Sequence, residues 1–518
     1  MAYRGEVVLG IDIGTQSLRS AIYSPTGDCL GVGVEPIETR HPHPAWAEQD
    51  ARQWWMAACQ AIPKSLEQAS ISADQVVAIG LDATACTVVA CDIAGQTLRP
   101  ALLWMDQRSF READDLSRTA DPILRYVSGV VSPEWMLPKA LWLKRNEPSI
   151  FDRADRIVEC TDWFMFQLTG QWNLSLNNVT VKWNYARPEG GWSRPMLSAV
   201  GLEDLLDKWP KEVVPLGQGN KVLSAKAAQE LGLKLGTPVA QGGIDAYLGM
   251  LGLGATKGGD LAMIMGSSTC HLAQTARPIL GSGLLGCYPD ATVEGLFTVE
   301  GGQTATGSIV DWYRRHLAGA EQQEADRLGR PVFEILDAKA AAVQPGSDGL
   351  VCLDYWQGNR CPLKDPRARG TIWGLTLSHT AGHLVRAIYE ATALGTRHLL
   401  EDAKTYGLSV ERVFAGGGGA QSQLWMQIHA DVLGQPIYLS SDPQACALGS
   451  AIVAATHVGW ASSLEQAATR MVQIDRTIEP NLAHRRVYDD LFAEYQATYH
   501  ALRPLMHARF GSTNLGEG

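Results

Sequence analysis

A repeated segment constrains the fold of this chain more than any other feature. An apolar run at residues 7–13 leads through Gly14 and Thr15 into a second short run. The pattern returns at residues 260–272, where the turn carries Gly266 and Ser267. Each copy predicts a strand, a turn built from glycine and hydroxyl residues, and an antiparallel strand. Two copies so far apart predict two like-folded halves.

Length and composition agree with two halves. A chain of 518 residues is too long for one hydrophobic core, so we expect an N-terminal domain at residues 1–251 and a C-terminal domain at residues 252–518. The net charge of −11, without a basic stripe, argues against nucleic acid as a partner.

The sequence also predicts a compartment. The N-terminus lacks an apolar signal core, and we find no apolar run long enough to cross a bilayer. None of the ten cysteines has C-x-x-C spacing, so free thiols are expected. We therefore expect a cytoplasmic protein without a membrane partner.

The first turn has the composition of a phosphate site. Backbone N–H groups at Gly14, Thr15 and Gln16 can hold phosphate oxygens. Asp12 is placed to hold a metal through water, and Arg19 to meet a terminal phosphate. An ordinary hairpin is the alternative, and the single turn does not separate the two.

A carboxylate follows two glycines at the middle of the chain. Gly242 and Gly243 allow a sharp strand-to-helix turn, from which Asp245 can project into a cleft as a catalytic base. A turn whose aspartate caps a helix is the alternative.

Two further glycine-rich segments lie in the second half. Residues 301–308 carry glycines and threonines where a helix begins, which favours phosphate, and Glu300 before them can accept from sugar hydroxyls. Residues 416–419 are four glycines between an apolar strand and a patterned helix. Bare backbone there suits a purine, and a flexible linker is the alternative.

A sugar pocket is predicted from polar residues near aromatic ones. Trp104, Asp106 and Arg108 together can line such a pocket, whereas an isolated buried tryptophan beside a helix-capping aspartate is the alternative. Lys182 can anchor a polyhydroxy ligand, although most lysines are solvated surface residues.

Local signals predict several helices. We expect Pro133 and Pro138 to break the helical region at residues 113–143. A helix ending at Gly170 is expected to have Thr161 or Asp162 as its cap, and residues 381–406 are expected to form one long helix.

Taken together, these segments resemble the FGGY family of carbohydrate kinases over essentially the whole chain. The matching pieces are Gly10-Ile-Asp-Ile-Gly-Thr-Gln-Ser, Trp104-Met-Asp-Gln-Arg, Gly242-Gly-Ile-Asp, Met265-Gly-Ser-Ser, Glu300-Gly-Gly-Gln-Thr and Gly416-Gly-Gly-Gly-Ala. The resemblance implies an α/β, two-domain actin-like ATPase (ribonuclease H-like) fold, with sugar and MgATP in the interdomain cleft. A homodimer is the expected assembly.

The resemblance also implies roles for residues. Asp245 matches the catalytic base and Asp12 the carboxylate near Mg²⁺. The nucleotide and phosphate positions are Gly14, Thr15, Gln16, Arg19, Gly266, Ser267, Gly302, Thr304, Gly307, Gly417, Gly418, Ala420 and Ser422. In the ribulokinase-type branch, which this chain resembles most, the positions matching Ala85, Lys182, Asp245 and Glu300 surround the sugar.

The expected reaction is phosphorylation of the terminal hydroxyl of a pentulose. The residues after Asp245 depart from the patterns of glycerol kinases and xylulokinases, and the chain is shorter than the usual L-ribulokinase, which favours D-ribulose. L-ribulose, ribitol or another polyol, and xylulose are the alternatives. Two other classes share the fold. A chaperone-type ATPase needs no sugar pocket. A catalytically silent sugar sensor is expected to lack an intact Asp12, Arg19 and Asp245, all of which are present here.

Overall fold

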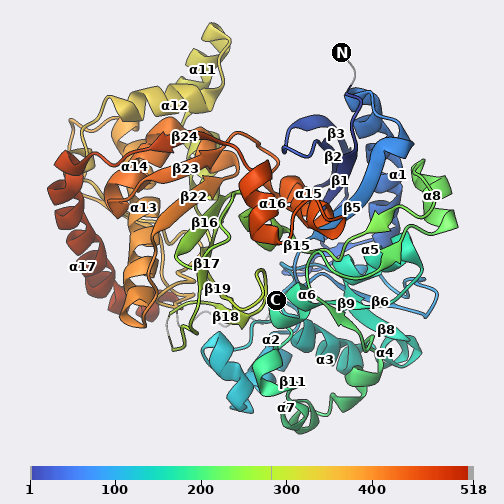
Figure 1. Ribbon diagram of the computed structural model, residues 1–518. Coiled ribbons are helices and arrows are strands. Elements are labelled where there is room, and N and C mark those ends of the chain that lie inside the picture. The colour runs from blue at the N-terminus through green and yellow to red at the C-terminus, as the bar shows by residue number, and fades with distance from the viewer. Residues whose placement is uncertain (1–2, 282, 511–518) are drawn as a thin grey trace.

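The computed structural model describes residues 3–281 and 283–510. Two α/β halves lie side by side, and helices α15 (Ala445–His457) and α16 (Leu464–Met471) lie where the halves meet (Figure 1). Each half contains a seven-stranded mixed sheet.

The first sheet has the order β13-β14-β5-β1-β2-β3, with β15 beside β5. Its strands are β1 (Val7–Ile13), β2 (Ser17–Tyr23), β3 (Cys29–Pro36), β5 (Val76–Ala83), β13 (Lys221–Val222), β14 (Pro238–Val239) and β15 (Gly243–Ile244). Alternate residues of β1 face opposite ways: Leu9 belongs to the core packed under α1 (Ala51–Ala69), and Val8 to the core packed under α15.

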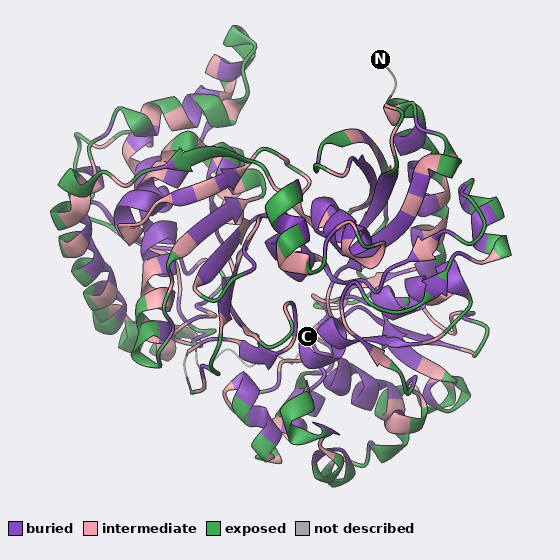
Figure 2. Cartoon of the chain, viewed as in Figure 1, coloured by how far each residue is buried: buried purple, intermediate pink, exposed green. Residues whose placement is uncertain are grey.

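The second sheet has the order β18-β19-β17-β16-β22-β23-β24. Its strands are β16 (Asp260–Met265), β17 (Thr269–Thr275), β18 (Gly286–Pro289), β19 (Phe297–Gln303), β22 (Arg412–Gly416), β23 (Ile437–Ser440) and β24 (Ile474–Ile478). The helices of this half include α10 (Gly307–His316), α13 (Ala381–Thr405), α14 (Gln423–Leu433) and α17 (Arg485–Phe510). The central strands of both sheets are buried, whereas the edge strand β24 and the outer helices carry many exposed residues (Figure 2).

The two sheets repeat one topology. Strand β1 pairs antiparallel with β2 and parallel with β5, and strand β16 pairs antiparallel with β17 and parallel with β22. This confirms the two-domain α/β fold predicted from the repeated segment.

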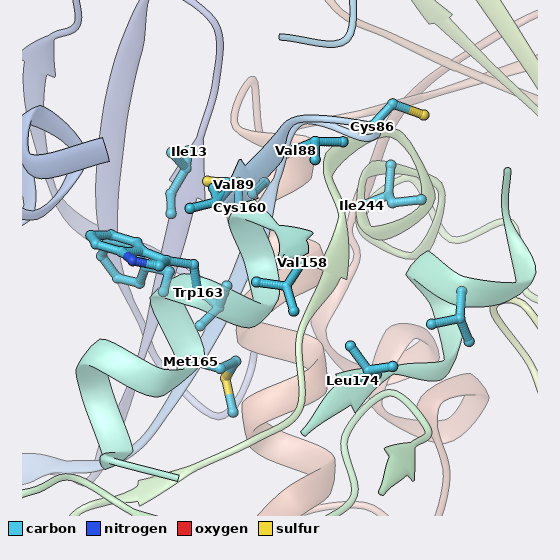
Figure 3. Close-up of a cluster of buried hydrophobic side chains, with 14 of the residues drawn as sticks. Ile13, Cys86, Val88, Val89, Val158, Cys160, Trp163, Met165, Leu174 and Ile244 are labelled. Atoms are coloured by element: carbon cyan, nitrogen blue, oxygen red, sulfur yellow. The ribbon is translucent and has the colours of Figure 1, made fainter. Parts of the chain in front are cut away.

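A smaller four-stranded sheet extends the first half. It has the order β4-β7-β6-β8 and is formed by β4 (Glu48–Gln49), β7 (Ala101–Leu102), β6 (Val88–Cys91) and β8 (Arg156–Glu159). Val88, Val158, Trp163 and Leu174 join Ile13 in one buried cluster (Figure 3). The loop that leaves β5 and the helix that follows β8 therefore rest on the same core as β1.

Two local predictions were wrong. Pro138 does not break a helix, because α3 (Met136–Asn146) begins two residues earlier and proline is tolerated in a first turn. Helix α5 (Cys160–Thr169) has Glu159 as its N-cap, with Asp162 completing a capping box, because the strand β8 runs on to Glu159. The long helix was predicted correctly.

The structure also shows the state of the cysteines and the character of the helices. All ten cysteines are free. Within residues 3–281 and 283–510, no helix combines the length and the apolar character needed to span a membrane.

Candidate active site

Three carboxylates meet where the central strands of the first sheet end. In the register of the sheet, Asp12 lies opposite Arg19 on β2 and opposite Asp82 on β5. Asp82 in turn pairs with Gly243, so the β15 turn brings Asp245, the first residue of α9 (Asp245–Gly252), to the same edge.

The contacts of these carboxylates differ. Asp12 Oδ2 accepts from Arg19 Nη1 at 3.1 Å. Asp82 Oδ2 accepts from Ser450 Oγ of α15 at 2.6 Å, while Asp82 Oδ1 is buried and accepts no hydrogen bond in the described part of the chain. Asp245 Oδ1 accepts from the backbone N–H of Ala246 at 2.7 Å.

Burial raises the pKa values of all three carboxylates. For Asp12, Arg19 opposes the rise, and for Asp82 the neighbouring Asp12 adds to it. Burial, and then Asp12, raise the pKa of Asp245 to about 7, against an opposing effect of Lys182. A carboxylate with a pKa near neutrality suits a general base.

A cavity of about 430 Å³, called the nucleotide-side cavity from here on, opens beside Asp12 and Arg19. Gly417 and Gly418 line its other side, where φ of Gly417 is +92° and a Cβ would lie 2.6 Å from the Met265 carbonyl oxygen. A Cβ on Gly418 would meet nothing within 4 Å. Bare backbone therefore faces a space that also contains a cation and a carboxylate.

Backbone hydrogen bonds shape the second hairpin. The Ser267 carbonyl oxygen accepts from the N–H groups of Thr306 and Ser308, both at 3.0 Å. A Cβ on Gly307 would lie 2.4 Å from the Gly266 carbonyl oxygen, so only glycine fits where α10 begins. The structure thus brings Gly266, Ser267 and Gly307 together.

Other predicted nucleotide residues lie elsewhere. Ser422 caps α14, because its hydroxyl accepts from the N–H of Trp425, and Ala420 is buried. Among the described residues, neither lines the nucleotide-side cavity. Thr304 donates towards the carbonyl oxygens of Gln357 and Gly358 and lines a different cavity.

Lys182 and Glu300 form a pair between the two halves. Lys182 Nζ lies 2.9 Å from Glu300 Oε1, and the Tyr247 hydroxyl donates to Glu300 Oε2 at 3.0 Å. Burial lowers the pKa of Lys182, but the charge and hydrogen bond of Glu300, together with the neighbouring Cys86 and Cys270, raise it above its ordinary value. Lys182 has φ of +73°, a left-handed backbone conformation that is uncommon for a residue other than glycine.

A second cavity, of about 300 Å³, lies on the Lys182 side. It is lined by residues of both halves, which include Glu134, Trp135, Lys182, Thr304, Asn359 and Arg360. Of these, only Lys182 and Thr304 were predicted from the sequence, because the other residues stand in loops without a recognisable pattern. Tyr247 was missed too, although it lies two residues after Asp245.

The three residues predicted to line one pocket at positions 104–108 have different contacts. Trp104 Nε1 donates to Thr15 Oγ1 at 3.0 Å, which places the indole against the first hairpin. Arg108 is buried and pairs with both Asp106 and Glu48, and Asp106 Oδ2 also accepts from the N–H of Ala47. Asp106 and Arg108 thus bind each other. Ala85 lies in the loop after β5, which Lys139 Nζ supports through the Cys86 carbonyl oxygen at 2.8 Å.

A buried carboxylate near a cavity that is lined by glycine backbone and a cation suits phosphoryl transfer, which depends on positioning and charge neutralisation. Residues 7–252 match the N-terminal domain, and residues 261–458 the C-terminal domain, of the FGGY family of carbohydrate kinases.

Individual proteins agree with these matches. The ribulokinase of Shouchella clausii (strain KSM-K16) is 34% identical, over 94% of this chain and 93% of that protein. An FGGY carbohydrate kinase domain-containing protein of Danio rerio is 33% identical, over 94% and 97%. The crystal structure of xylulose kinase from Rhodospirillum rubrum has a TM-score of 0.86 at 30% identity, covering 97% of this chain and 100% of that one. The chain therefore belongs to the FGGY family of carbohydrate kinases, which makes it an ATP-dependent sugar kinase.

Proposed function

We propose that this kinase phosphorylates the terminal hydroxyl of a pentulose, with Asp245 as the general base. D-ribulose is the first candidate for the pentulose. The observation that carries the proposal is the position of Asp245. Asp245 begins α9, whose Gly249 lines the nucleotide-side cavity and whose Tyr247 donates to Glu300, the ion-pair partner of the Lys182 that lines the second cavity. A base between donor and acceptor sites is what direct phosphoryl transfer requires.

In the proposed reaction, the sugar hydroxyl oxygen attacks the γ-phosphorus of ATP. The bond from that phosphorus to the β–γ bridging oxygen breaks, ADP leaves, and the hydroxyl proton passes to Asp245. The N–H groups of the two hairpins and the Arg19 guanidinium neutralise phosphate charge, while Lys182 and Glu300 hold other hydroxyls of the sugar. Approach of the two halves excludes water and limits idle ATP hydrolysis.

The residues around Asp12 fit a magnesium ion. Asp12 and Asp82 are buried next to each other, and Asp82 Oδ1 accepts no hydrogen bond within the described ranges. Kinases bind Mg²⁺ through one or two carboxylates, water and substrate phosphates, so a larger cluster of protein ligands is not needed. Bound there through Asp12, Mg²⁺ would neutralise charge on the β- and γ-phosphates.

Names of relatives support the choice of pentulose. The Shouchella clausii relative is a ribulokinase, which favours ribulose. The Rhodospirillum rubrum structure is a xylulose kinase at 30% identity, which makes xylulose the second candidate.

We also propose that the two domains of the chain divide between residues 251 and 252. The homodimer and the cytoplasmic location stay predictions.

A substrate panel tests the proposed function. ADP release would be measured with MgATP and D-ribulose, L-ribulose, D-xylulose, L-xylulose, ribitol, erythritol or glycerol. We expect D-ribulose to give the highest kcat/KM. A higher value for xylulose would favour the second candidate, and ATP binding without ADP release on any member would contradict a pentulose kinase.

A further inference from the structure

The second cavity contains a cation that the mechanism above does not use. The loop at residues 357–366 brings Arg360 to the cavity from the C-terminal half, and Glu134 and Trp135 line it from the N-terminal half. Lys182 lines the same space. A ligand in this cavity would therefore contact both halves.

Arg360 lies close to the proposed reaction centre. Its stem runs over β19, since a Cβ on Gly302 would lie 3.9 Å from Arg360 Cδ. The charges of Arg360, Lys182, Glu300 and Asp245 all act on the pKa of the Cys270 thiol, which burial raises most. Arg360 therefore shares one neighbourhood with the groups assigned to the sugar.

Most N–H donors of Arg360 have no protein partner among the described residues. A guanidinium carries five N–H donors. Within residues 3–281 and 283–510, the single side-chain hydrogen bond of Arg360 runs from Nη2 to Glu134 Oε1, at 3.4 Å. The same Glu134 oxygen accepts from Gln107 Nε2 at 3.1 Å, so it does not depend on Arg360.

We propose that Arg360 is a sugar-binding residue, which donates hydrogen bonds from its guanidinium to adjacent oxygens of the acceptor. This rests on the proposed sugar kinase activity. The planar fork of an arginine matches two oxygens held side by side, which an open-chain ketose or polyol offers along its carbon chain. Arg360 thereby sets sugar affinity from the C-terminal half, opposite the lysine supplied by the N-terminal half.

The competing role for such an arginine is neutralisation of the transferred phosphoryl group. Two features favour the sugar. Arg360 lines the cavity that contains Trp135 and Lys182, and among the described residues it does not line the cavity that contains Asp12 and Gly417. Its one charged partner, Glu134, is an acceptor suited to hydroxyls and unfavourable next to phosphate.

Sugar affinity without nucleotide separates these roles. The dissociation constant for D-ribulose, or for the panel member with the highest kcat/KM, would be measured by calorimetry for wild type and Arg360→Met. We expect the variant to bind sugar about 10- to 100-fold more weakly, the usual loss for hydrogen bonds to a charged group. Affinity for a non-hydrolysable ATP analogue should stay unchanged, which also shows that the variant is folded.

A matched control lies directly after this loop. Arg367 is about half exposed, pairs at 3.9 Å with Asp365, and does not line the cavity in the described part of the chain. Arg367→Met should bind sugar as wild type does. If Arg360→Met does not fold, Arg360→Lys replaces it, since it keeps the charge but loses the fork, and a several-fold weaker sugar affinity is expected.

The outcomes distinguish the two proposals. A wild type that phosphorylates a pentulose, with an Arg360→Met variant that binds this sugar equally well, overturns the role of Arg360 and leaves the proposed function standing. Unchanged sugar affinity with a large fall in kcat would assign Arg360 to the phosphoryl group instead. A wild type silent on the whole panel overturns both.

Discussion

At the scale of single residues, the environment of Asp245 links burial to chemistry. Its pKa is raised to about 7, by burial first and by Asp12 second. The protonated carboxyl cannot accept the proton of a hydroxyl, so kcat/KM for the sugar should fall as the pH drops through about 7 and level off above it. A pH–rate profile of the wild type checks this, and a profile flat from pH 5.5 to 8.5 would contradict it.

Replacing Asp245 tests the same carboxylate directly. Asp245→Asn keeps the size and the position at the start of α9 but cannot act as a base. We expect kcat to fall by about two to four orders of magnitude, the usual worth of a positioned base. Calorimetric affinity for MgATP, the control, should stay within a few-fold. Near-normal turnover would remove Asp245 from this role.

Residues were predictable where the backbone demands a particular type. Gly307 and Gly417 stand where a Cβ would collide with a carbonyl oxygen, so their glycine signal was visible in the sequence. Glu134 and Arg360 have ordinary side chains in irregular loops, and the fold alone brings them together from positions 226 residues apart. The sequence of Asp106 and Arg108 is compatible with a pocket as well as with a mutual ion pair, and only the structure shows that the two charges bind each other.

At the scale of elements, helix α15 is pressed against the first sheet through glycines. A Cβ on Gly80 of β5 would lie 1.9 Å from the Ser450 carbonyl oxygen, and one on Gly10 of β1 would lie 2.2 Å from that of Ala447. Helix α15 consists largely of small residues, which permits this close approach. This contact supports the site, because Ser450 also donates to Asp82.

Filling this contact should destabilise the protein. Gly80→Ala forces α15 away from β5, at a cost of about 1–3 kcal/mol in the free energy of unfolding. Urea unfolding followed by circular dichroism measures it. Gly258→Ala is the matched control, since Gly258 is exposed, its added Cβ meets nothing within 4 Å, and a change within about 0.5 kcal/mol is expected. Equal stability of the two variants would show that α15 shifts freely.

At the scale of the whole molecule, the repeat made the architecture predictable. It did not predict which residues line the second cavity. Two strand–turn–strand copies are visible in sequence because glycine and hydroxyl turns interrupt apolar runs. The second cavity exists only where loops of opposite halves meet, through Lys182 with Glu300 and Glu134 with Arg360. Such contacts leave no periodic signal.

Because both cavities depend on how the halves sit, the two ligands should strengthen each other's binding. A sugar that contacts both Lys182 and Arg360 favours approach of the halves, and a nucleotide held by Arg19 and Gly417 favours the same approach. Coupling between two such sites is typically about 5- to 150-fold in affinity and is reciprocal. In Asp245→Asn, which allows ATP itself to be used without turnover, calorimetry should therefore show tighter MgATP binding when sugar is present. The tightening of sugar binding by MgATP should match it. An unchanged MgATP affinity at saturating sugar would mean that the halves do not move together on binding.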